Sequence, residues 1–141
     1  MKAIIIDDDP MIRALLANVF QRKNFEVVTY ANPTECPLYS TKVCPCQAEK
    51  PCPDIIITDY DMPFVNGVEF ITALRKNGCL FPHIALMTGS SLPGQIIEQA
   101  AFMGVKFFAK PFHREQINNW LNQIEPSLHS REARFPDCKS G

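Results

Sequence analysis

With 141 residues, of which 46% are apolar and 21% charged, the chain has the composition of one globular domain with a modest hydrophobic core. Its formal net charge of -1 argues against nucleic-acid binding through a basic surface. No apolar run approaches the length of a membrane span, and the run at residues 3–6 is too short for a signal-peptide core, so we expect a cytoplasmic protein.

The first predicted elements are a buried strand at residues 2–6 and an amphipathic helix that follows it. The strand sequence, K-A-I-I-I, runs directly into three aspartates at residues 7–9. Asp9 is placed to cap the helix, whose first position tolerates Pro10. Residues 25–30 then predict the second strand, so the chain begins as a strand–helix–strand unit.

The segment at residues 31–53 interrupts this regular pattern with five prolines. Because proline removes a backbone donor and restricts the residue before it, we expect at most a short helix within residues 33–43. Four cysteines in the segment match the ligand number of a tetrahedral Zn²⁺ site or an iron–sulfur cluster, with redox disulfides or unliganded thiols as alternatives. These cysteines are Cys36, Cys44, Cys46 and Cys52.

The run at residues 54–67, D-I-I-I-T-D-Y-D-M-P-F-V-N-G, predicts the central strand of the fold. Its β-branched residues suit a strand that is buried on both faces and ends at Asp59. Ligand sites of parallel sheets lie beyond the carboxyl ends of the strands, so we expect Asp59 at that edge. The extended chain between Cys52 and Asp59 places the cysteine segment toward the opposite edge.

The rest of the chain continues the alternation of helices and strands. We predict helices at residues 68–75, 93–103 and 114–124, and strands at residues 83–88 and 105–109. This pattern indicates an α/β fold, a flavodoxin-like doubly wound five-stranded parallel sheet with strand order 2-1-3-4-5. We expect one domain over residues 1–126 and a polar tail over residues 127–141.

In that strand order, polar residues from four strands meet at one edge of the sheet. The three carboxylates of Asp7, Asp8 and Asp59 would repel one another unless a cation lies among them. A divalent ion that prefers oxygen ligands, Mg²⁺ or Mn²⁺, fits this set. Asp59 is then a candidate phosphoryl acceptor, with Lys110 as a fixed cation and Thr88 as a hydroxyl donor for phosphoryl oxygens.

Four stretches give the chain a specific resemblance to two-component response-regulator receiver domains, similar to chemotaxis-type single-domain regulators. They are I-I-I-D-D-D at residues 4–9, I-I-I-T-D-Y-D-M-P-F-V-N-G at 55–67, A-L-M-T-G at 85–89 and F-F-A-K-P-F at 107–112. The resemblance implies a signalling domain whose Asp59 accepts a phosphoryl group from a sensor histidine kinase or phosphotransfer protein. Its only chemistry would be self-catalysed phosphoryl transfer and autodephosphorylation.

The resemblance also implies a role for each site residue. Asp8, Asp59 and the backbone carbonyl of Asp61 would bind Mg²⁺ directly, and Asp7 would do so through water. Lys110 would pair with the phosphoryl group, and its bond to Pro111 would be cis.

Thr88 and Phe107 would form a switch pair that alters the surface of the fourth helix, fifth strand and last helix. Tyrosine or histidine is more common than phenylalanine at residue 107, so a plain core role for Phe107 is the alternative. Output would be contact with an unknown downstream protein or phosphorylation-dependent homodimerisation, from either a single-domain regulator or an excised receiver.

Two other functions compete with this interpretation. The pair D-Y-D at residues 59–61 resembles the D-x-D of haloacid-dehalogenase-type phosphatases, in which Asp61 would be the acid/base. That family places the pair after its first strand, and the pattern leaves Asp7 and Asp8 unexplained. The second alternative is a metal or redox sensor that acts through the cysteine segment and whose receiver site is vestigial.

Overall fold

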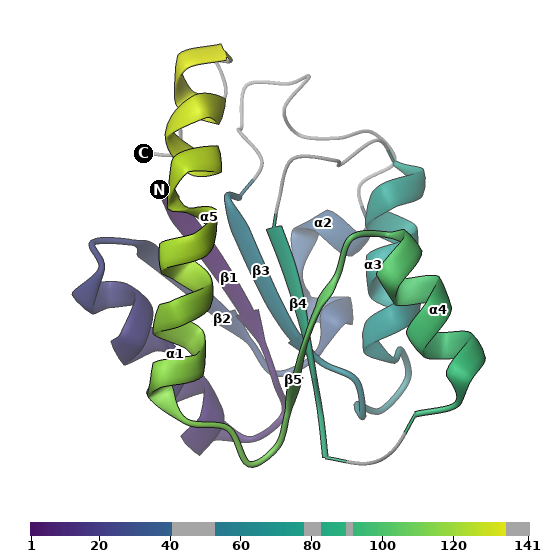
Figure 1. Cartoon of the computed structure of the whole chain (residues 1–141). Coiled ribbons are helices and arrows are strands. Elements are labelled where there is room, and N and C mark those ends of the chain that lie inside the picture. Colours follow the sequence, from purple (N-terminus) through teal and green to yellow (C-terminus); the bar gives the residue numbers. More distant parts are fainter. Residues whose placement is uncertain (41–52, 78–82, 90–91, 135–141) are drawn as a thin grey trace.

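Five parallel strands form a single sheet in a computed structural model that describes residues 1–40, 53–77, 83–89 and 92–134 (Figure 1). The strand order is β2-β1-β3-β4-β5, which confirms the predicted flavodoxin-like topology. The strands are β1 (Lys2–Ile6), β2 (Glu26–Tyr30), β3 (Ile55–Asp59), β4 (His83–Thr88) and β5 (Lys106–Ala109). The central strand β3 is buried along its whole length, as its run of β-branched residues predicts.

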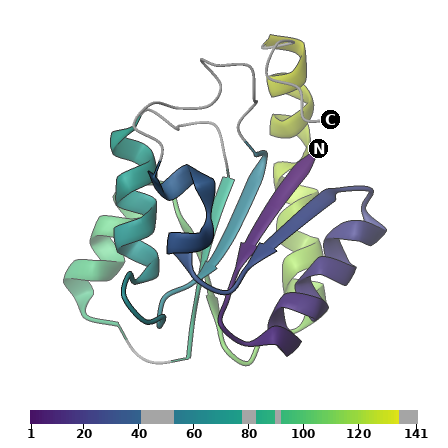
Figure 2. The same ribbon diagram turned by 180° about the vertical axis from the view of Figure 1, so that it is seen from behind.

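Helices cover both faces of the sheet (Figures 1 and 2). They are α1 (Pro10–Arg22), α2 (Pro37–Ser40), α3 (Gly67–Lys76), α4 (Gly94–Phe102) and α5 (Arg114–Arg134), with a 3₁₀ turn, η1, at Pro33–Glu35. Helices α1 and α5 pack with Ile5 and Ile57 on one face, whereas α3 and α4 pack with Ile4 and Ile56 on the other. Alternate strand residues therefore supply two separate hydrophobic clusters, as the two-residue period of a strand requires.

Side-chain caps fix where the helices next to the acidic sheet edge begin. Asp9 caps α1 by accepting a hydrogen bond of 2.8 Å from the backbone N–H of Met11, as predicted, and Pro10 is the first helical residue. Asn66 and Glu69 form a reciprocal capping box at the start of α3. Helix α1 thus starts three residues after Asp7, and α3 starts eight residues after Asp59.

The last helix differs from its prediction. Helix α5 runs to Arg134, whereas the sequence pattern predicted an end at residue 124 and a polar tail from residue 127. Pro126 lies inside the helix, and Leu128 is buried against the cluster that contains Phe25. Beyond Leu128, the apolar period stops while the helix continues.

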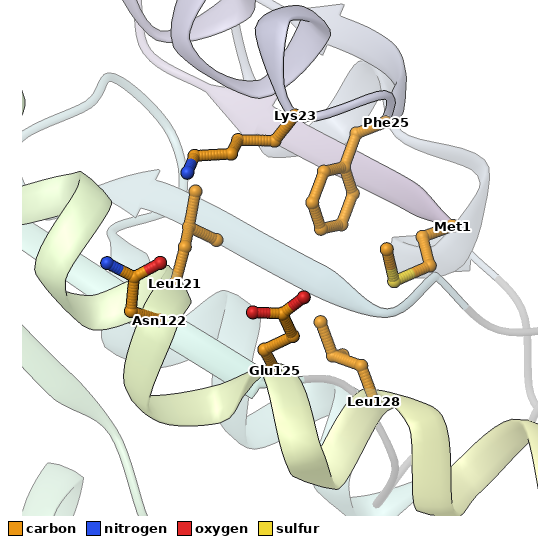
Figure 3. Close-up of a pocket in the computed structure, with 7 residues that line it drawn as sticks. All are labelled: Met1, Lys23, Phe25, Leu121, Asn122, Glu125 and Leu128. Carbon is orange, nitrogen blue, oxygen red and sulfur yellow. The ribbon is translucent and has the colours of Figure 1, made fainter.

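A small pocket of about 80 Å³ lies between this helix and the N-terminal edge of the sheet (Figure 3). It is lined by Met1, Lys23, Phe25, Leu121, Asn122, Glu125 and Leu128. None of the helices in the described part of the chain has the combined length and hydropathy that crossing a lipid bilayer requires.

The proline-rich segment contains only short helical pieces where the structure describes it, η1 and the four-residue α2. Asn32 caps η1, and Pro33 is buried at its first position. This agrees with the expectation of at most a short helix in this part of the chain. The ring of Tyr39 in α2 lies 6.2 Å from that of Phe70 in α3, so the short helix packs against its neighbour.

Candidate functional site

Three carboxylates come together at the carboxyl edge of the sheet, where β1 and β3 end. One carboxylate oxygen from each of Asp7, Asp8 and Asp59 lies within 4.8 Å of the other two. Asp7 is completely buried and Asp59 is 4% exposed, whereas Asp8 faces solvent. We refer to these three residues as the acidic pocket, and the sequence-based expectation that they converge is confirmed.

Hydrogen bonds to the backbone and side chain of Asp7 hold it in place. Its carboxylate accepts the Asp9 N–H at 2.8 Å, and its own N–H donates to the Tyr30 carbonyl at 3.1 Å in the neighbouring strand. The Arg13 guanidinium donates to the Asp7 carbonyl at 2.7 Å. Sequence reasoning missed Arg13, although its place one turn after the Asp9 cap, on the helix that follows the acids, is the signal that could have indicated it.

Lys110 brings the neutralising charge into the acidic pocket. Its Nζ lies 2.9 Å from Oδ2 of Asp7 and 3.3 Å from Oδ2 of Asp59. The Lys110 N–H donates to the Thr88 carbonyl at 2.8 Å, and the bond between Lys110 and Pro111 is cis, as expected. The loop after β5 is therefore tied to the end of β4 at the residue that supplies the ammonium group.

The pocket perturbs the protonation of its own groups. The pKa of Asp59 is raised to about 6, first by burial and then by the nearby Asp7 charge, while Lys110 and the Asp61 N–H act in the opposite direction. Burial lowers the pKa of Lys110, but hydrogen bonds and charge attraction from Asp7 and Asp59 outweigh it, so the net shift is upward. One ammonium group thus only partly offsets the repulsion between two buried carboxylates.

A close approach between Gly67 and the end of β3 shapes the adjoining loop. A Cβ at residue 67 would lie 2.6 Å from the carbonyl oxygen of Asp59 and 2.5 Å from Cδ1 of Leu86. The Gly67 N–H donates to the Tyr60 carbonyl at 3.1 Å, which closes the loop over residues 60–67. Only glycine allows α3 to begin this close to the strand end.

The other predicted site residues lie nearby but in different environments. Thr88 ends β4 directly after Met87, the residue paired with Asp59, and is half-buried. Asp61 is exposed in the loop after β3. Phe107 is half-buried opposite Leu86 and packs against the cluster on the α3 and α4 face. Their assigned roles in metal binding and switching remain predictions.

The predicted cysteine site falls mostly outside the described residues, which include Cys36 but not Cys44, Cys46 or Cys52. Cys36 is 1% exposed and packs in the same hydrophobic cluster as Ile6. A thiol in this position packs as a small hydrophobic side chain.

The acidic pocket is a chemically suitable site for Mg²⁺ or Mn²⁺. Both ions prefer carboxylate, carbonyl and water oxygens, and the pocket offers three carboxylates with a deficit of positive charge. The exposed Asp8 also leaves one side open to solvent, as an ion that retains water requires.

Comparison with known proteins identifies the family. Residues 3–122 match the family described as "Response regulator receiver domain". The chain belongs to this family. Receiver domains are signalling domains of two-component response regulators, which interact with histidine kinases or phosphotransfer proteins. This assignment also leaves the phosphatase-type interpretation of residues 59–61 without support.

Two curated relatives of similar length are the Probable chemotaxis protein CheY of Rhizobium etli and the Sporulation initiation phosphotransferase F of Bacillus subtilis. The first is 26% identical over 91% of this chain and 95% of its own length. The second is 26% identical over 89% of this chain and 94% of its own length. Among solved structures, Vibrio cholerae CheY4 has a TM-score of 0.69 at 28% identity and covers 87% of this chain and 97% of its own.

Other relatives are much longer than the matched region. The alkaline phosphatase synthesis transcriptional regulatory protein PhoP of Bacillus subtilis is 25% identical over 87% of this chain but over only 48% of its own length. The chain thus spans about half the length of this relative, and its similarity concerns the receiver region alone.

Proposed function

We propose that Asp59 accepts a phosphoryl group from a phosphohistidine of a sensor kinase or phosphotransfer protein, within a two-component phosphorelay in the cytoplasm. One observation carries this proposal. The Lys110 ammonium group lies 3.3 Å from the Asp59 carboxylate, inside a cluster of three aspartates. A carboxylate nucleophile with a fixed cation beside it supplies positioning and charge neutralisation, which are most of what phosphoryl transfer requires.

In this proposal, Asp8, Asp59 and the backbone carbonyl of Asp61 hold Mg²⁺ or Mn²⁺, with Asp7 acting through water. The ion would neutralise charge on the phosphoryl oxygens and reduce the repulsion within the acidic pocket. Arg13 would act indirectly, since it holds the backbone of Asp7.

Lys110 and Thr88 would bind the phosphoryl group once it is attached to Asp59. Lys110 would exchange its contact with the Asp59 carboxylate for one with a phosphoryl oxygen, and the Thr88 hydroxyl would donate a further hydrogen bond. The 2.8 Å hydrogen bond from the Lys110 N–H to the Thr88 carbonyl couples the two residues through the backbone. Autodephosphorylation would return the domain to its starting state.

We further propose that Thr88 and Phe107 transmit phosphorylation to the surface formed by α4, β5 and α5. A cavity of about 230 Å³ on this surface is bordered by Phe107, Lys106 and Trp120, which makes the surface sensitive to the position of the Phe107 ring. Output would occur through contact with a downstream protein, with phosphorylation-dependent homodimerisation as an alternative.

A second proposal concerns the cysteine segment, which could bind Zn²⁺ or an iron–sulfur cluster or act as a redox sensor. Its support is the number of cysteines, Cys36, Cys44, Cys46 and Cys52, in one short segment. Metal analysis of protein purified without oxygen would test this proposal.

The metal part of the main proposal is tested by calorimetric titration of Mg²⁺ into the full chain. We expect Asp8→Asn to weaken Mg²⁺ binding at least tenfold. Asp9→Asn is the matched control, because it changes a neighbouring carboxylate whose observed role is to cap α1 and asparagine also caps well. Equal Mg²⁺ affinity in wild type and Asp8→Asn would contradict the proposed ligand set, and so would labelling by acetyl phosphate that is insensitive to EDTA.

A further inference from the structure

In the loop between β3 and α3, Phe64 combines an unfavourable backbone conformation with a highly exposed side chain. Phe64 has a backbone φ of 73°, in the left-handed region that bulky residues rarely adopt, and its surface is 89% exposed. The Val65 N–H donates to the Pro63 carbonyl at 2.9 Å, so Phe64 is the central residue of a strained γ-turn. Neither burial nor backbone preference in the isolated domain accounts for an aromatic residue there.

The turn is also held firmly. The Pro63 carbonyl accepts a second hydrogen bond, from the Asn32 side chain at 3.4 Å, and the Gly67 N–H closes the loop onto the Tyr60 carbonyl. The turn is thus anchored both to the segment after β2 and to its own base. An exposed aromatic ring on such a support loses little conformational freedom when it binds a partner.

Geometry limits how far this ring can lie from the acceptor. Gly67 follows Phe64 by three positions, so their Cα atoms are at most about 11 Å apart. A Cβ on Gly67 would lie 2.6 Å from the Asp59 carbonyl oxygen, which keeps Phe64 within about 15 Å of that oxygen. A protein interface of ordinary size covers about 800 Å² on each partner, or a radius of about 16 Å.

A donor protein whose interface is centred on Asp59 therefore extends far enough to reach Phe64. Asp59 is 4% exposed, so the donor imidazole has to enter the acidic pocket past its rim. Met11, at the start of α1, is a second exposed apolar residue close to the aspartates, with 80% of its surface accessible. Together, Phe64 and Met11 are two of the four large hydrophobic residues that are exposed in the described part of the chain.

We propose that Phe64 is a docking anchor for the phosphohistidine-bearing donor protein, an inference that rests on the proposed function of Asp59. The donor would place an apolar surface against the Phe64 ring, since exposed aromatic side chains are favoured as anchors in protein interfaces. In the transfer step, the P–N bond of phosphohistidine breaks as a P–O bond to the Asp59 carboxylate forms. The imidazole nitrogen leaves with the electron pair and takes up a proton. Phe64 takes no part in this bond exchange.

The test compares protein and small-molecule donors on the full chain. Sensor-kinase transmitter domains encoded in the same genome are loaded with labelled phosphate, and the fastest donor to the wild type is used. Acetyl phosphate serves as the small donor, with no docking surface. Phe64→Asn removes the ring and keeps a residue that tolerates a positive φ. Phe102→Asn is the matched control, because Phe102 is 94% exposed at the end of α4.

We expect Phe64→Asn to lower kcat/KM for transfer from the kinase at least tenfold, while labelling by acetyl phosphate stays within twofold of wild type. Phe102→Asn should change neither rate. Unchanged transfer from the kinase to Phe64→Asn would overturn the inference, as would an equal loss with both donors, since Phe64 would then act within the pocket.

Two further results would also overturn the docking role. One is a wild type that acetyl phosphate labels but no kinase does. The other is a concentration-dependent dimer that Phe64→Asn abolishes without changing transfer, because the ring would then serve a second copy of the chain. If neither donor labels the wild type, the proposed function of Asp59 fails first and the docking role fails with it.

Discussion

The Nζ of Lys110 lies 3.3 Å from Oδ2 of Asp59, although the two residues are far apart in the sequence. Asp59 ends β3, and Lys110 lies in the loop after β5. The contact exists because β3 and β5 flank the same strand, β4, and all three end at one edge of the sheet. Among the ion pairs of the described residues, Lys110 is the only cation that contacts the proposed acceptor, Asp59.

Replacing this cation should destabilise the metal-free domain. We expect Lys110→Met to lower the free energy of unfolding by about 2 kcal/mol, because two buried carboxylates lose their charged hydrogen-bond partner. Urea unfolding in EDTA measures this change. Lys106→Met, on the strand that leads to Lys110, is the control, since Lys106 is exposed and its replacement should cost less than about 1 kcal/mol. Equal losses from both substitutions would contradict the structural role of Lys110.

The raised pKa of Asp59 predicts a specific pH dependence of stability. The folded state holds a proton on Asp59 up to about pH 6, whereas the unfolded carboxyl has its ordinary pKa of 3.8. The folded state therefore binds more protons within that window, and the contribution of Asp59 to stability falls as pH rises from about 4 to about 6.

Asp59→Asn should remove this contribution. At pH 7 in EDTA, we expect the variant to exceed wild type in free energy of unfolding by about 1–3 kcal/mol, with a much smaller gain at pH 4. Saturating Mg²⁺ should narrow the gap, because a cation offsets the repulsion among the carboxylates. A difference between variant and wild type that stays constant from pH 4 to pH 7 would show that Asp59 is not destabilised by its surroundings.

The close approach at Gly67 predicts that even a methyl group is not tolerated there. Gly67→Ala should cost about 1–3 kcal/mol of stability, because the new Cβ would lie 2.6 Å from a backbone oxygen of Asp59 that cannot easily move. Gly94→Ala is the matched control, since no atom lies within 4 Å of a Cβ at the first residue of α4. That change should be neutral or stabilise by up to about 1 kcal/mol. Thermal unfolding of both variants decides the point, and a Gly67→Ala variant as stable as Gly94→Ala would be inconsistent with the observed packing.

The extension of α5 predicts a structural role for residues that the sequence pattern assigned to a tail. Leu128→Ala should lower stability by about 2 kcal/mol, because the Leu128 side chain is buried against Phe25. The neighbouring void of about 80 Å³ places the cost at the lower end for a leucine truncation, since the site is already loosely packed. Asn122→Ala, on the exposed side of the same pocket, should cost less than about 0.5 kcal/mol. A stable Leu128→Ala variant would restore the tail interpretation.

Much of the fold and of the acidic pocket could be predicted because their signals are local. The isoleucine runs before Asp7 and Asp59 mark buried strands, and the order of a doubly wound sheet then brings the strand ends together. The end of α5 was harder to predict, because Pro126 and the polar residues around it resemble a helix terminus. Leu128 continues the apolar spacing from Ile124, but it is the one residue in the sequence that indicates a longer helix.

Other features depend on tertiary contacts that a sequence pattern does not contain. The hydrogen bond of Arg13 to the Asp7 carbonyl depends on the path of the turn between β1 and α1, which the position of Arg13 in the sequence suggests but does not determine. The positive φ of Phe64 contradicts the preference of phenylalanine, so propensity would predict the opposite. Two hydrogen bonds hold that turn. One joins the Asn32 side chain to the Pro63 carbonyl, across a long stretch of sequence, and the other joins the Gly67 N–H to the Tyr60 carbonyl, across the loop.

The most direct test of the account is to locate the phosphorylated residue after reaction of the full chain with acetyl phosphate and Mg²⁺. Peptide mapping by mass spectrometry compares wild type with Asp59→Asn and Asp61→Asn. The second variant is the matched control, because Asp61 is proposed to contribute only its backbone carbonyl. The account predicts a single phosphoryl group on Asp59 in wild type and Asp61→Asn and none in Asp59→Asn. Undiminished labelling of Asp59→Asn, or a phosphoryl group mapped to another residue of the wild type, would contradict it.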